Sequence, residues 1–114
     1  MTIDQLRQFC LTLPGVTEDI KWEHDLCFSV GKKMFAVTGM ENAEGGISVK
    51  TTPEKFAELT ERPGIRPAHY VARYHWVTVE DPKAVTSDEL RQLIRESYQL
   101  VFDKLPAKIK KTIN

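Results

Sequence analysis

Apolar residues recur every three or four positions near the start of the chain, and this spacing predicts an amphipathic helix. Its buried face comprises Ile3, Leu6, Phe9, Cys10 and Leu13. Thr2 and Gln5 stand at the spacing of a capping box, where a hydroxyl and an amide satisfy free backbone N–H groups of the first turn. Pro14 and Gly15 predict the end of this helix.

The same spacing over a longer stretch predicts the main helix of the second half. Its apolar stripe comprises Leu90, Leu93, Ile94, Tyr98, Val101, Phe102 and Leu105. Thr86 and Glu89 form a second pair at capping-box spacing, and Pro106 breaks the helix. We expect residues 107–114 to form a last helical turn or a frayed end.

A shorter helix is predicted in the middle of the chain. It begins at Thr52-Pro53, because a proline at the first helical position gives up no hydrogen bond that it would have made. Phe56 and Leu59 anchor this helix, and a Pro-Gly pair at 63–64 ends it.

Alternating apolar and polar residues between the predicted helices indicate β-strands. The expected strands cover residues 26–30, 34–40, 47–50 and 75–80. A turn at residues 31–33 and a polar loop at residues 41–46 connect the first three strands as consecutive hairpins. Such a meander forms an antiparallel sheet with one buried and one solvated face. The order of the elements predicts an α+β fold in which two main helices pack on one face of the sheet.

The composition is that of one small domain of 114 residues. Its longest apolar runs fall far below the roughly 20 residues that span a bilayer. No secretory signal opens the chain, so we expect a cytoplasmic protein without membrane contact. Cys10 and Cys27 form no CxxC pair, and we expect them to be reduced core residues rather than a disulfide or a metal site.

Charge is balanced overall but divided along the chain. Sixteen basic and sixteen acidic residues give a formal net charge of zero. Residues 1–61 hold six Lys and Arg against ten Asp and Glu, whereas residues 62–114 hold ten against six. A net charge of zero counts against strong non-specific binding of polyanions, while the acid-poor second half favours an anionic partner.

Five stretches of the sequence together suggest a family. They are LPGVTEDIKW (13–22), FSVGKKMFAV (28–37), ISVKTTPEKFAEL (47–59), PGIRPAHYVARYHWVTV (63–79) and SYQLVFDKLPAK (97–108). In this order they resemble the MmcQ/YjbR family of small bacterial proteins, and residues 1–114 are expected to form one such domain. The resemblance implies a CyaY-like, or frataxin-like, α/β sandwich. It also implies DNA binding through a double-wing arrangement of hairpins, and it brings no catalytic residues.

Residues 62–80, RPGIRPAHYVARYHWVTVE, concentrate basic and aromatic side chains and end in their single acid. The guanidinium groups of Arg66 and Arg73 suit phosphate oxygens, which accept two hydrogen bonds from one fork. Tyr74 and Trp76 are aromatic rings on which a base can stack. This stretch therefore predicts contacts with DNA.

The alternative for the same stretch is structural. Tyr70 and Trp76 would then be core aromatics, and the arginines would pair with acids elsewhere in the fold. The candidate acids are Glu18, Asp19 and Asp25. Both roles ask for the same residue types, so the sequence leaves them open.

Lysines elsewhere complete the predicted DNA-contacting surface. They are Lys32 and Lys33 at a hairpin tip, Lys50 at a strand end, and Lys104, Lys108, Lys110 and Lys111 near the C-terminus. Such clusters bind phosphates by releasing counterions, but charged hairpin tips also keep proteins monomeric and lysines also favour a helix C-terminus. Double-stranded DNA is therefore the predicted partner. The alternative is a non-catalytic module that binds a protein or a small ligand on the open sheet face.

Histidines and acids form no recognisable metal or catalytic motif. His69 and His75 are six residues apart, without the helical spacing of an HExxH pair, and no metal is expected. The first helix carries Asp4 as its only acid, which disfavours the iron binding of frataxins. An acidic patch follows that helix at Glu18, Asp19, Glu23 and Asp25.

No GxSxG, P-loop or GxGxxG motif is present, so we expect no enzyme activity and no cofactor. Ser97 is expected to pack against a neighbouring helix.

Overall fold

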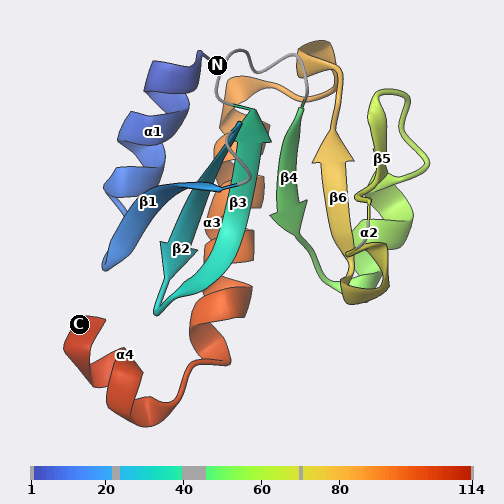
Figure 1. Cartoon of the computed structure of the whole chain (residues 1–114). Helices are drawn as coiled ribbons and strands as arrows, with labels where there is room; N and C mark the ends of the chain where they lie inside the picture. The colour runs from blue at the N-terminus through green and yellow to red at the C-terminus, as the bar shows by residue number, and fades with distance from the viewer. Residues whose placement is uncertain (1, 22–23, 40–45, 70, 114) are drawn as a thin grey trace.

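A computed structural model of the chain describes residues 2–21, 24–39, 46–69 and 71–113 (Figure 1). Its helices are α1 (Ile3–Leu11), α2 (Pro53–Leu59), α3 (Ser87–Asp103) and α4 (Ala107–Ile113), with short 3₁₀ turns η2 (Ala72–Tyr74) and η3 (Pro82–Ala84). Its strands are β1 (Val16–Lys21), β2 (Asp25–Val30), β3 (Lys33–Gly39), β4 (Ile47–Lys50), β5 (Ile65–Pro67) and β6 (Trp76–Val79). These strands form one antiparallel sheet in the order β1-β2-β3-β4-β6-β5, which confirms the predicted α+β fold.

The hydrophobic core lies between one face of the sheet and the helices α1 and α3. It brings Leu6 and Cys10 of α1, and Leu93 and Ile94 of α3, into one cluster with inward-facing strand residues. Those strand residues include Phe28, Ala36, Val49, Val77 and Val79. In Figure 1, α3 lies behind the centre of the sheet and α1 lies beside β1.

The two predicted capping boxes differ in outcome. The first is complete, because the Gln5 N–H donates to the Thr2 hydroxyl (3.1 Å) and the Thr2 N–H donates to the Gln5 side chain (2.9 Å). In the second, the Glu89 N–H donates to the Thr86 hydroxyl (3.1 Å). The Glu89 carboxylate instead accepts two hydrogen bonds from Arg62, at 2.7 and 3.0 Å, so the return half of this box was wrongly predicted.

Two strands were not predicted. β1 occupies residues that were expected only to follow the first helix, and it pairs with β2 along its whole length. β5 directly follows the Pro-Gly pair that was expected to end the short helix, and it pairs with β6 from Ile65↔Val79 to Pro67↔Val77. Proline is compatible with this outer strand because its missing N–H faces away from the ladder.

The second face of the sheet is less solvated than predicted. Cys27, Ser29, Trp76 and Thr78 alternate with the core residues and yet are buried. Ala68, His69 and Val71 follow β5 and line a groove with Trp76 and Thr78, which shields that part of the face from water. Some residues named in the sequence predictions lie outside the part of the chain that the structure describes. They are Glu23, Tyr70 and residues 40–45.

Candidate functional site

Strands β3 and β4 pair over three residues and then separate, with Ser97 of α3 between them. The last pair is Ala36↔Val49, and the next position along the ladder would join Phe35 to Lys50. Instead, the Ser97 hydroxyl donates to the Phe35 carbonyl (2.6 Å) and accepts from the Lys50 N–H (2.9 Å). Ser97 is fully buried, so its hydroxyl replaces a direct bond between the strands. The expectation that Ser97 packs against a neighbouring helix was wrong.

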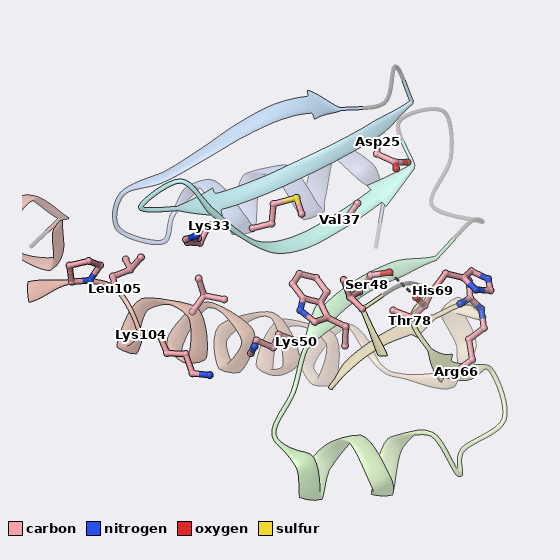
Figure 2. A pocket seen from close by; sticks show the side chains of 16 residues that line it. Asp25, Lys33, Val37, Ser48, Lys50, Arg66, His69, Thr78, Lys104 and Leu105 are labelled. Atoms are coloured by element: carbon pink, nitrogen blue, oxygen red, sulfur yellow. Dashed lines mark hydrogen bonds between the residues drawn. The ribbon is translucent and has the colours of Figure 1, made fainter. Parts of the chain in front are cut away.

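A groove of about 990 Å³ opens where the two strands separate. Its apolar lining includes Met34, Val37, Val71, Trp76, Val101 and Leu105, from the sheet face opposite the core and from the end of α3. Its charged lining comprises Lys33, Lys50, Arg66 and Lys104, with Asp25 as the one acid among the described residues. Figure 2 shows Lys33, Lys104 and Leu105 toward one end of the groove, and His69 and Arg66 toward the other. The volume is that of a site for a small organic molecule.

Lys50 is the cation of the groove that lies where β3 and β4 separate. Its backbone is fixed by the Ser97 hydroxyl, and its partner across the ladder is the buried Trp76. Burial lowers the pKa of its ammonium, and the positive charge of Lys104 lowers that pKa further. The ammonium lies 6.0 Å from the centre of the Tyr74 ring, and no carboxylate of the described residues pairs with it. A partly desolvated charge without a counterion favours an anion nearby.

The predicted arginines and aromatics divide between structural and exposed positions. Arg66 forms an ion pair with Glu80, which differs from the acids considered in the structural alternative, and it also donates to the Pro67 carbonyl (3.1 Å). Arg73 stacks on Tyr74, with its guanidinium carbon 4.8 Å from the ring centre. Tyr74 is half exposed, so its ring is accessible. Trp76 is buried and lines the groove, so little of its ring is available to a base.

The hairpin-tip lysines and the C-terminal lysines converge in the fold. Gly31 and Lys32 both have positive φ, as a tight two-residue hairpin turn requires. A Cβ atom at Gly31 would lie 2.7 Å from Leu105 Cδ1 and 3.2 Å from Ile109 Cγ2, so the turn packs directly on the chain between α3 and α4. We call Lys32, Lys33, Lys104, Lys108, Lys110 and Lys111 the lysine cluster. None of these six forms an ion pair with a carboxylate of the described residues.

The described residues form neither a metal-binding cluster nor a membrane-spanning helix. No group of three or more His, Cys, Asp or Glu side chains in the described residues is arranged to hold a metal ion. The predicted acidic patch is divided, because Glu18 is bound by Arg7 at 2.6 and 2.9 Å. Cys10 and Cys27 are both buried free thiols, and burial raises the pKa of the Cys10 thiol to about 12. None of the described helices has the length and apolarity needed to cross a bilayer.

Sequence reasoning named the open sheet face only as the alternative site for a protein or small ligand, and it missed the groove on that face and the role of Ser97. A signal for Ser97 was present, because it lies within the stripe of α3 between Ile94 and Val101, where a buried hydroxyl needs a hydrogen-bond partner. For Met34 and Val71 no local signal exists, because only the tertiary fold brings them to the lining of one groove.

Comparisons with known proteins place the chain in a family. The model of the YjbR family matches residues 11–100. The Escherichia coli K12 protein YjbR is 28% identical over 117 residues, covering 99% of this chain and 98% of its own, and E. coli O157:H7 YbdF is 28% identical over 113 residues, covering 94% and 89%. A crystal structure of a Deinococcus radiodurans protein has a TM-score of 0.86 at 31% identity, covering 98% of this chain and 87% of its own. The crystal structure of a Pseudomonas syringae protein has a TM-score of 0.69 at 26% identity, covering 89% of this chain and 99% of its own. The chain is therefore a member of the YjbR family.

Proposed function

We propose that this protein is a non-catalytic, cytoplasmic DNA-binding protein whose lysine cluster contacts the phosphate backbone. The frataxin-like sandwich and its double-wing use of hairpins, both implied by the family resemblance, belong to this proposal. One observation carries it: the packing of Gly31 against Leu105 and Ile109. This contact places the tip of the β2–β3 hairpin beside α4, although about seventy residues separate them in sequence.

The charges of the cluster support phosphate binding. Its six lysines come from two segments, and Figure 1 shows α4 close to the lower ends of β2 and β3. Uncompensated lysines displace the counterions condensed on DNA phosphates, and release of those counterions drives binding. The ion pair with Glu80 makes Arg66 a weaker contact than the cluster, whereas Arg73 and Lys50 remain predicted contacts at the cluster's margin.

The test is fluorescence anisotropy of a labelled random duplex, titrated with protein at several salt concentrations. We expect binding in about the micromolar range at low salt, weakening linearly in the logarithm of salt concentration. The double variant Lys110→Gln and Lys111→Gln should reduce the salt slope by about 0.9 for each phosphate that is no longer neutralised. Lys83→Gln is the matched control, because Lys83 is exposed on η3 beyond the far end of β6. No binding at low salt, or an equal effect of the control, would refute the proposal.

A further inference from the structure

The groove between β3 and β4 has the features of a second binding site, which shares Lys33 and Lys104 with the lysine cluster. It is concave, mainly apolar, and opens next to a fixed cation, which are the general properties of small-molecule sites. Duplex DNA is too wide to enter a groove of about 990 Å³. A ligand of this groove must therefore be narrower than duplex DNA.

We propose that the groove binds an amphipathic organic anion, with the charged head beside Lys50 and Lys104 and the apolar body over the sheet. Charge complementarity argues for the head group. Lys33, Lys50 and Lys104 lie toward one side of the groove, and Figure 2 shows Asp25, the one acid of its described lining, on the opposite side from Lys104. An anion between Lys50 and Lys104 relieves the repulsion between two neighbouring ammonium groups.

The apolar lining argues for the body of the ligand. Met34, Val37 and Val71 are partly exposed and present hydrocarbon surface, and burying such surface stabilises a complex by roughly 25 cal/mol for each Å² removed from water. Ser48 and Thr78 are the polar groups in the middle, but their hydroxyls bond each other at 2.7 Å. Their mutual bond leaves this part of the groove suited to an apolar chain or ring.

The test uses decanoate as the anion and decanol as its neutral counterpart, each displacing 8-anilinonaphthalene-1-sulfonate whose fluorescence reports the groove. We expect decanoate to displace the dye at about tenfold lower concentration than decanol. Lys50→Met should abolish this preference, because it removes the charge and keeps most of the length of the side chain. Lys83→Met, on the exposed η3, should leave it unchanged. Circular dichroism verifies that each variant remains folded.

A second measurement needs no variant. Decanoate should shift the amide NMR signals of Val37, Ser48 and Lys50 and leave those of α1 unmoved. Equal affinity for decanoate and decanol, or shifts centred outside the groove, would overturn the proposal. The outcome is separable from DNA binding, since the double variant Lys110→Gln and Lys111→Gln removes charges that do not line the groove and should leave decanoate affinity unchanged.

Discussion

Replacing Ser97 by alanine tests whether one hydroxyl holds the sheet open. The variant removes the donor to the Phe35 carbonyl and the acceptor of the Lys50 N–H. The first bond is buried, so the Phe35 carbonyl is left without a partner, at a cost of about 1–3 kcal/mol. The Lys50 N–H borders the groove, where water can replace Ser97, so its contribution is smaller. The free energy of unfolding should therefore fall by about 2 kcal/mol.

Urea unfolding followed by circular dichroism measures this change, and a fall of about 8 °C in Tm should accompany it. Hydrogen exchange should also become faster at the Lys50 amide. Ser87→Ala is the control, because Ser87 is exposed at the start of α3 and should change stability by less than about 0.5 kcal/mol. A decrease below about 0.5 kcal/mol for Ser97→Ala would mean that β3 and β4 close and bond directly, and the reasoning would be refuted.

Two further predictions concern an ion pair and a turn. The hydrogen bonds from Arg7 hold the pKa of Glu18 below its ordinary value, so the pair stabilises the fold above pH about 4.5, and this advantage is lost as the pH falls through the lowered pKa. The difference in unfolding free energy between wild type and Glu18→Gln should be present at pH 7 and disappear in acid, whereas a difference independent of pH would contradict this origin. Gly31→Ala should lower the free energy of unfolding by about 1–3 kcal/mol, because φ is +56° and the new methyl group would lie 2.7 Å from Leu105. An unchanged stability in thermal unfolding would exclude that contact.

Local signals predicted the helices and most of the sheet. The capping threonines, the Pro53 start of α2 and the apolar stripe of α3 each depend on neighbours within a few residues, and such short-range chemistry survives into the fold. β1 was harder because half of its residues face solvent and their alternation is weak. The β1 strand exists because β2 offers it a complete ladder.

The site depended on contacts that no short window of sequence contains. Ser97 and Lys50 meet across 47 residues, and Arg66 pairs with Glu80, directly after the neighbouring strand β6, rather than with an acid of the acidic patch. The sequence gives the positions of the six lysines along the chain. That they lie near one another follows only from the packing of Leu105 against Gly31. Pairing of charges is decided by tertiary packing, so composition alone left the roles of these residues open.

The short pairing of β3 with β4 also determines how the molecule deforms. Three residue pairs, from Ala36↔Val49 to Thr38↔Ile47, join a three-stranded unit on each side, and α3 spans both. Stiffness across a sheet comes from its ladder bonds, so this three-pair seam is a line about which the two units can rotate. Small rotations of the two units about it change the width of the groove far more than its length. Ligands of the proposed site should therefore be able to vary more in thickness than in length.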